Sequence, residues 1–250
     1  MINWEHPNNP PKFDRRFYNE IHSAHWHSMT SRECLLELND VLCGLIFFID
    51  WTHVALKDRL SLCPVMFSLS IIPQWLRFYS FSWRPLGFLK KLSSSKVRGQ
   101  NMTNHHQMLR AVFNGVVDAQ KLGGIKCTVR NHEGQVTRLT FKVPLCFVVG
   151  DVKGHDVLCG HYHSHHTKRL SRECDCPTDQ ASNSKFECTF TSMDDIARLR
   201  ASPNKKECLQ RASYHDLDNA SSDIWFGAGN PHASEKGKNQ VGHFKSNFWH

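Results

Sequence analysis

Two apolar runs that each stop at an aspartate place the strongest constraint on how this chain folds. The first, "LCGLIFFIDWTH", has seven large apolar or Cys residues among the eight from Leu42 to Ile49, and ends at Asp50. The second, "VPLCFVVGDVKGHD", runs from Leu145 to Val149 and reaches Gly150 and Asp151. Runs of this length are typical of buried strands. The second lacks alternation, which predicts a central strand covered on both faces.

Other elements are predicted around the first run. A short helix is expected over Ser31–Asp40, with Ser31 as its N-cap and Leu35 and Leu38 facing inward. The first strand is then expected over Val41–Ile49. The β-branched and aromatic stretch Pro64–Ile72 predicts a second strand. A third extended piece is expected over Phe78–Phe88.

The sequence then predicts a loop, a helix and a hairpin. The loop is the polar, Ser-rich and basic segment Lys90–Asn104. In "NHHQMLRAVFNGVVDAQKLGG" apolar residues recur at helical spacing, Asn104 can cap the start and Gly123-Gly124 can end the helix. A hairpin follows, formed by "IKCTVR", the turn "NHEG" and "QVTRLTFKV".

This order predicts an α/β fold in which the first strand and the strand after the long helix lie side by side and parallel. Asp50 and Asp151 would then emerge at the same sheet edge. Two neighbouring carboxylates repel each other, and a divalent cation relieves that repulsion. The pair therefore predicts a site for Mg²⁺ or Mn²⁺. The alternative is that each aspartate only caps the turn that follows it.

A Cys- and His-rich stretch follows the second aspartate. "CGHYHSHHTKRLSRECDCP" places seven Cys and His residues between Cys159 and Cys176, and Cys188 lies not far beyond. Thiolates and imidazoles are the ligands that Zn²⁺ prefers, four at a time. The predicted zinc ligands are His165, Cys174, Cys176 and Cys188. The alternative is a solvated His-rich loop with incidental thiols.

The net charge of +8 is concentrated in one quarter of the chain. Residues 71–130 contain ten Lys or Arg and one acid, Asp118. Because aromatic residues interleave with these basic residues, the segment fits polyanion binding, although an ordinary solvated face has the same composition. The residues predicted to bind nucleic acid are Arg77, Arg84, Lys90, Lys91, Lys96 and Arg98.

The N-terminus lacks the pattern of a secretory leader, and Asp50 interrupts the longest apolar run, so neither secretion nor a membrane span is expected. Several of the ten cysteines lie inside expected strands, where a free thiol acts as a small hydrophobe. A reducing compartment, the nucleus or the cytoplasm, is therefore the expectation.

Four stretches carry a resemblance to a known family: "LIFFIDWTHVALKDRLSLCPVMFSLSI", "SWRPLGF", "VPLCFVVGDVKGHDVLCG" and "SYHDLDNA". They are similar to transposases of the Plavaka type and their Kyakuja–Dileera–Zisupton relatives, and the likeness covers about Leu42 to Gly227. The resemblance implies a ribonuclease H-like mixed sheet flanked by helices, with a Cys/His-rich insertion. It also implies DNA as the partner and the nucleus as the location, and leaves self-association open.

In that family an Asp-Asp-Glu/Asp triad binds two Mg²⁺ or Mn²⁺ ions for DNA strand cleavage and joining. Asp50 and Asp151 match the first two acids. No residue is marked as the third, although Glu207 and Asp223 are available. The family pattern also stops near residue 229, so the resemblance implies a truncated copy whose site is incomplete or inactive.

The expected organisation has five parts: an irregular and helical lead-in (1–40), the first part of the catalytic core (41–158), the Cys/His-rich insertion expected to bind zinc (159–190), a helical continuation of the core (191–228) and a divergent, disordered tail (229–250). Three classes of function are consistent with this organisation. They are a transposase-derived enzyme, a non-catalytic DNA- or chromatin-binding protein with the same fold, and an unrelated zinc-stabilised interaction module.

Overall fold

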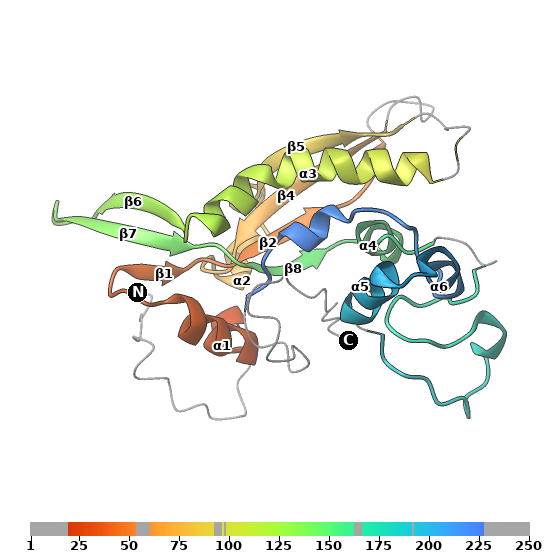
Figure 1. Cartoon of the computed structure of the whole chain (residues 1–250). Helices are drawn as coiled ribbons and strands as arrows, with labels where there is room; N and C mark the ends of the chain where they lie inside the picture. The colour runs from red at the N-terminus through yellow and green to blue at the C-terminus, as the bar shows by residue number, and fades with distance from the viewer. Residues whose placement is uncertain are drawn as a thin grey trace.

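The computed structural model describes residues 20–53, 61–92, 97, 99–162, 167–191 and 193–227. Within these ranges the chain has a mixed α/β architecture, with two β-sheets and several helices (Figure 1). The α/β class predicted from the sequence is confirmed. The predicted lead-in up to residue 19 and the predicted tail from residue 229 lie outside the described residues. No helix of the described ranges is long and apolar enough to cross a membrane.

The main sheet is built from β2 (Leu45–Ile49), β3 (Thr52–His53), β4 (Ser61–Leu69), β5 (Arg84–Lys90) and β8 (Leu145–Val149). Antiparallel pairs join β2 to β4 and β4 to β5, whereas β8 pairs with β2 in parallel. The order across the sheet is therefore β5–β4–β2–β8. The short β3 continues along β4 on the side that β2 occupies.

The long helix α3 (Gln100–Lys121) covers one face of this sheet. Its apolar stripe is buried against the strands, and the ring of Phe113 stacks on that of Phe47 with centroids 5.3 Å apart. The helix ends where Gly123 and Gly124 adopt positive φ values. A Cβ at Gly124 would lie 2.7 Å from the carbonyl oxygen of Phe141, so the turn needs glycine there.

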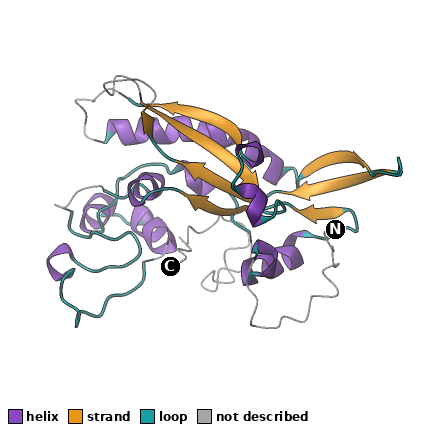
Figure 2. Ribbon diagram, turned by 180° about the vertical axis from the view of Figure 1, so that it is seen from behind, coloured by secondary structure: helices purple, strands orange, loops and turns teal. Residues whose placement is uncertain are grey.

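A second, three-stranded sheet extends the main one. It contains β1 (Asp40–Leu42), β7 (Val136–Lys142) and β6 (Ile125–Arg130), in the order β1–β7–β6. Strands β1 and β7 are parallel, and each leads directly into its neighbour of the main sheet, β2 or β8. The β6–β7 hairpin, predicted from the sequence and confirmed, projects as an arm beyond the helices (Figures 1 and 2).

Helices after β8 form a smaller core. They are α4 (Val152–Cys159), α5 (Met193–Ala201) and α6 (Lys205–Arg211), followed by the 3₁₀ helix η5 (Ala220–Asp223), which packs against α3. The buried residues of this core are Cys159, Ile196, Leu209, Ala212 and Tyr214. The residues between α4 and α5 contain little regular structure, apart from the 3₁₀ turn η4 (Thr178–Gln180) and isolated β-bridges.

The N-terminal part differs from the sequence prediction. The helix is α1 (His25–Cys34), preceded by the 3₁₀ turn η1 (Ile21–Ser23), and Ser31 lies near its end instead of capping its start. Helix formation stops before Asp40 because that carboxylate accepts hydrogen bonds from the backbone N–H groups of residues 36 and 37, at 3.0 Å each. Leu38, predicted to face inward, is 84% exposed.

The strand predictions need smaller corrections. The run over residues 41–49 is two strands, because it breaks at Gly44, where a Cβ would lie 2.9 Å from Trp26. The second and third strands are displaced to the bounds of β4 and β5, since α2 (Gln74–Arg77) and η3 (Ser80–Ser82) occupy the connection between them. Strand β8 is at the edge of the described sheet instead of its centre, and Val149 is 40% exposed.

The long helix also begins earlier than predicted. It starts at Gln100, after Gly99 as its N-cap, so Asn104 lies one turn inside the helix, where its side chain accepts a hydrogen bond from that of Gln100. The residues that the sequence assigned to a loop up to position 104 therefore contribute the first turn of α3.

Candidate functional site

The parallel pairing of β2 and β8 brings the two predicted aspartates to one end of the sheet. Phe48 is paired with Val149, and Asp50 and Asp151 each lie two residues beyond that pair. The backbones are very close at this point, since a Cβ added to Gly150 would lie 2.7 Å from the carbonyl oxygen of Ile49. Glycine before Asp151 thus allows the two strand ends to approach each other.

Each aspartate also makes a local hydrogen bond. Asp50 Oδ1 accepts one from the backbone N–H of Trp51 at 2.7 Å. Asp151 is the N-cap of α4, and its Oδ1 accepts one from the backbone N–H of Gly154. The capping role predicted as the alternative to metal binding is therefore present. It engages one oxygen of each carboxylate and is compatible with a cation bound through the other.

The Cys63 thiol on β4 lies within electrostatic reach of both carboxylates. Burial raises the pKa of this thiol to about 12, and the negative charges of Asp50 and Asp151 contribute to the increase. Both charges raise the pKa of the same buried thiol, so the two carboxylates contribute to the electrostatic potential at one position. This is the region in which a cation would be favourable.

Two adjacent histidines of α3 pack against residues that follow the two strands, and no sequence pattern predicted a role for them. The His105 ring packs against Trp51, the residue after Asp50, with centroids 6.1 Å apart. His106 Nε2 lies 3.0 Å from the carbonyl oxygen of Val157 on α4, and its Nδ1 accepts a hydrogen bond from the backbone N–H of Ala220. The adjacent His pair on the apolar side of a predicted helix was the available signal.

Burial lowers the pKa of His105 and of His106 to about 4, so both rings are neutral at pH 7. A neutral imidazole beside Trp51 adds no positive charge that would repel a cation. His105 therefore packs as a neutral ring beside Trp51, the residue that follows Asp50, and His106 joins α3 to α4 and η5.

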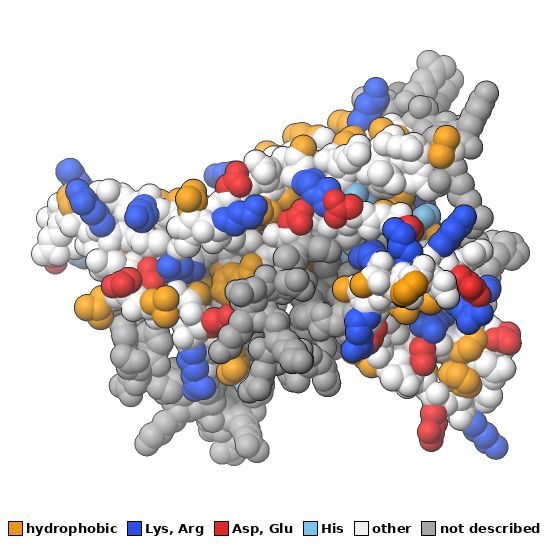
Figure 3. All heavy atoms as spheres, viewed as in Figure 1, with side chains coloured by type: hydrophobic (Ala, Val, Ile, Leu, Met, Phe, Trp, Pro, Cys, Tyr) orange, Lys and Arg blue, Asp and Glu red, His pale blue; other side chains and the backbone are white. Residues whose placement is uncertain are grey.

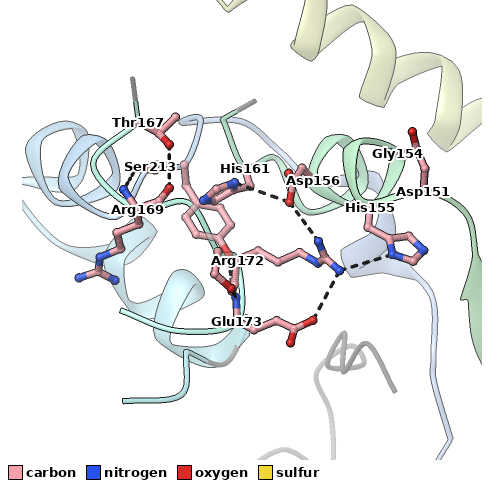
Figure 4. A network of polar contacts seen from close by, with 12 residues as sticks. Asp151, Gly154, His155, Asp156, His161, Thr167, Arg169, Arg172, Glu173 and Ser213 are labelled. Carbon is pink, nitrogen blue, oxygen red and sulfur yellow. Dashed lines mark hydrogen bonds and ion pairs between the residues drawn. The ribbon is translucent and has the colours of Figure 1, made fainter. Parts of the chain in front are cut away.

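Behind Asp151, a buried polar network connects α4 with the insertion (Figure 4). Arg172 Nη1 donates to Asp156 Oδ1 at 3.2 Å, and both side chains are about 90% buried. The same carboxylate lies 3.6 Å from Nδ1 of His161, which is fully buried. The second guanidinium nitrogen of Arg172 reaches His155 Nδ1 and Glu173 Oε1, at 3.5 Å each.

This network holds the insertion against α4, the helix that Asp151 caps. His155 lies in the first turn of α4, and its pKa is lowered mainly by burial and further by the charge of Arg172. A neutral His155 can accept the hydrogen bond from Arg172. The position of Asp151 is thereby connected through α4 to Arg172, two residues before Cys174.

Neither candidate for the third acid completes a metal site. Glu207 forms an ion pair with Arg211 on its own helix, α6, at 2.6 Å. Asp223 pairs with Arg110 of α3 at 2.8 Å. In the part of the chain that the structure describes, no three His, Cys, Asp or Glu side chains are grouped so that they could hold a metal ion. Mg²⁺ often takes only one or two carboxylates from a protein, because substrate phosphates and water supply its other ligands.

Three of the four predicted zinc ligands, Cys174, Cys176 and Cys188, lie in the same loop of the insertion, but among the described residues their side chains do not form a three-ligand metal group. An isolated antiparallel β-bridge between Cys174 and Phe190 joins two segments of this loop. The pKa of the Cys188 thiol is raised by a hydrogen bond to Cys174 and then by the charges of Cys174 and Cys176. The pKa of Cys176 is raised by partial burial and by Cys174. The fourth predicted ligand, His165, lies outside the described residues.

The residues predicted to bind nucleic acid are divided between the two ends of the sheet. Lys90 is paired with Leu62, near the carboxylates, whereas Arg84 is paired with Phe67 toward the other end. Both are exposed, as is Lys91. Arg77 is only 14% exposed, because it donates to the carbonyl oxygen of Ile72 and forms an ion pair with Glu20. Lys96 and Arg98 lie outside the described residues.

The sequence was also compared with known proteins. A scan against models of protein families and a search of curated proteins each found no match to this chain.

Proposed function

We propose that this chain is a transposase-derived, DNA-processing protein with a ribonuclease H-like core, in which Asp50 and Asp151 hold Mg²⁺ or Mn²⁺. The observation that carries the proposal is the parallel pairing of β2 and β8, which brings the two aspartates to one end of the sheet. The strand order supports it as well. Three antiparallel strands, a helix and a fourth strand parallel to the first form the order that the sequence resemblance implies.

The chemistry proposed for this site is phosphoryl transfer. Bound divalent ions would polarise the scissile phosphate and lower the pKa of an attacking water or 3′-hydroxyl. The Asp50 and Asp151 carboxylates would hold and orient these ions, each fixed by one backbone hydrogen bond. Trp51 and His105 would limit access of water, and the exposed Lys90 and Lys91 at the same end of the sheet would contact DNA phosphates without reading bases.

A second candidate is a non-catalytic DNA- or chromatin-binding protein that keeps the same fold. The observation that favours it is that, among the described residues, no third acid converges on the aspartate pair. Under this proposal the pair still binds a cation, but strand cleavage is absent. Both candidates act on DNA, so we place the protein in the nucleus. The insertion would be stabilised by Zn²⁺ in either case, through Cys174, Cys176 and Cys188 with His165 as the fourth ligand.

The proposed function is tested by titrating Mn²⁺ into the purified chain in a calorimeter and by assaying the nicking of supercoiled plasmid. Asp50→Asn and Asp151→Asn retain the local hydrogen bonds but lose the charge. We expect each to weaken Mn²⁺ binding by about tenfold or more, because each removes one of two charged ligands. The control Asp118→Asn, on the exposed side of α3, should bind as the parent chain does.

The outcomes separate the candidates. Mn²⁺-dependent nicking that both Asn variants lose supports the enzyme, whereas Mn²⁺ binding without nicking supports the non-catalytic protein. If the parent chain binds no Mn²⁺, or if the two variants bind as well as Asp118→Asn does, the metal site is wrong.

A further inference from the structure

The arm formed by the β6–β7 hairpin has two chemically different faces. Directly paired residues of an antiparallel ladder point to the same face. One face therefore carries Ile125 with Phe141, Cys127 with Leu139, and Val129 with Thr137. The other carries Lys126 with Thr140, Thr128 with Arg138, and Arg130 with Val136. We call the second set the basic face.

The charges of the basic face are available to a partner. Lys126, Arg130 and Arg138 are exposed, and none has an acidic partner among the described residues. The carboxylate of Asp40, which the register places on this face, is 2% exposed and paired with Lys142 at 3.3 Å. Glu133 lies in the turn and faces His132. In Figure 3 Lys and Arg side chains line the arm at the left of the view.

The arm is also a defined and exposed structure. Asn131 fixes its turn, since its Oδ1 accepts hydrogen bonds from the backbone N–H groups of Glu133 and Gln135. Every residue of β6 except Cys127 is exposed, and so is every residue from 131 to 138. Three cations on an exposed ribbon with threonine hydroxyls between them form a surface complementary to a row of phosphates.

We infer that the basic face of the β6–β7 arm is a binding site for duplex DNA, separate from the aspartate pair. The inference rests on the proposed function only for the choice of DNA as the polyanion. A two-stranded ribbon fits a DNA groove about 12 Å wide, because its strands lie about 5 Å apart. Single-stranded DNA is disfavoured because the basic face carries no aromatic ring on which bases could stack.

The position of the arm sets the length of DNA that can engage both sites. Strands β7 and β8 follow each other along the chain, so the arm and Asp151 lie at opposite ends of that line. The fifteen steps from residue 136 to residue 151 span at most about 50 Å at ~3.3 Å per residue. A duplex of about 15 base pairs covers this distance at ~3.4 Å per pair. A duplex of this length or longer can therefore reach both sites.

The test measures fluorescence anisotropy of a labelled 24-base-pair duplex at several salt concentrations, with EDTA present so that the metal site cannot contribute. In the triple variant Lys126→Gln, Arg130→Gln, Arg138→Gln we expect binding at 100 mM salt to weaken about tenfold or more. The slope of log K against log salt should fall by about 2.7, since three phosphate contacts are lost at ~0.9 each.

A matched control removes three exposed charges elsewhere, with Arg198→Gln, Lys206→Gln and Arg211→Gln, and should keep the parental slope. A charge-preserving variant, Lys126→Arg, Arg130→Lys, Arg138→Lys, should bind as the parent does. An arm variant with unchanged affinity and slope overturns the inference. So does an equal loss in the control variant, or a preference of the arm for a polyglutamate competitor over DNA.

Failure of this inference is distinguishable from failure of the proposed function. If the chain does not bind Mn²⁺, DNA binding measured in EDTA can still depend on the arm. If the arm does not bind DNA, Mn²⁺ binding and its dependence on Asp50 are unchanged.

Discussion

At the scale of single residues, the Arg172–Asp156 pair is the most consequential contact outside the aspartate site. Both side chains are about 90% buried, and the guanidinium also reaches His155 and Glu173. Burying an ion pair costs desolvation of both charges, so its net contribution to stability is small as long as the pair is intact. The consequence of removing one partner is large, because the other charge then stays buried without compensation.

We therefore predict that Arg172→Ala lowers the free energy of unfolding by about 3–5 kcal/mol, as measured by urea denaturation. The control is Arg211→Ala in the exposed pair with Glu207, which should cost less than about 1 kcal/mol. The double variant Arg172→Ala, Asp156→Asn should cost less than the sum of the two single changes, because both act on one interaction. Additive costs would show that the two residues are energetically independent.

At the scale of elements, the insertion between α4 and α5 is the least regular part of the described chain. Its described residues are joined by isolated β-bridges, and the thiol of Cys188 lies close to that of Cys174. A segment with so little regular structure gains stability from a bound metal, since binding free energy adds to folding free energy.

We predict that the purified chain contains about one zinc ion per molecule, and that Cys174→Ser and Cys188→Ser each lose most of it. Elemental analysis by mass spectrometry measures the content. The control Cys127→Ser, on the arm, should retain the parental amount. Zinc content below a tenth of an equivalent in the parent chain would contradict the prediction, as would full retention in both Ser variants.

The sequence predicted the structure correctly where a local pattern determines how strands run or where an element ends. Two apolar strands that are connected through a helix are expected to pair in parallel, so their C-terminal ends lie at the same edge of the sheet. The position of Asp50 and Asp151 at one edge could therefore be predicted. The turn residues Gly123 and Gly124 likewise marked the end of α3. The hairpin followed from its alternation and its turn.

It failed where a single side-chain contact decides the structure. The carboxylate of Asp40 ends the first helix by binding two backbone N–H groups, which no periodicity reveals. The contact between His105 and Trp51 joins residues far apart in the sequence, and Arg172 meets Asp156 through a loop without a repeating pattern. Contacts of this kind depend on how elements pack, and a single sequence does not record them.

At the scale of the whole molecule, buried neutral histidines make stability depend on pH. His106 is 1% exposed and joins α3 to α4 and η5, and its pKa is lowered from 6.5 to about 4, mainly by burial. A group whose pKa is lower in the folded state contributes stability above the unfolded pKa. That contribution is lost as the pH falls from about 6.5 toward 4.

We predict that lowering the pH from 7.5 to 5.0 reduces the free energy of unfolding, with His106 alone contributing on the order of 2 kcal/mol to the loss. In His106→Gln the difference between the two pH values should shrink by that amount. In His132→Gln, which changes a ring that is 89% exposed, the difference should equal that of the parent. Urea denaturation at both pH values measures it, and an undiminished difference in His106→Gln would exclude this residue as a source.

The double parallel pairing of β1 with β7 and of β2 with β8 has a consequence for how the protein is made. Val41 meets Phe141, 100 positions later in the chain, and α3 lies between them. Antiparallel neighbours such as β4 and β5 can assemble early, because short connections join them. The two parallel pairs can form only after a long segment of the chain has closed into a loop. During synthesis the first aspartate therefore has no counterpart until the ribosome has passed the second, and β2 exposes an unpaired edge for that whole interval.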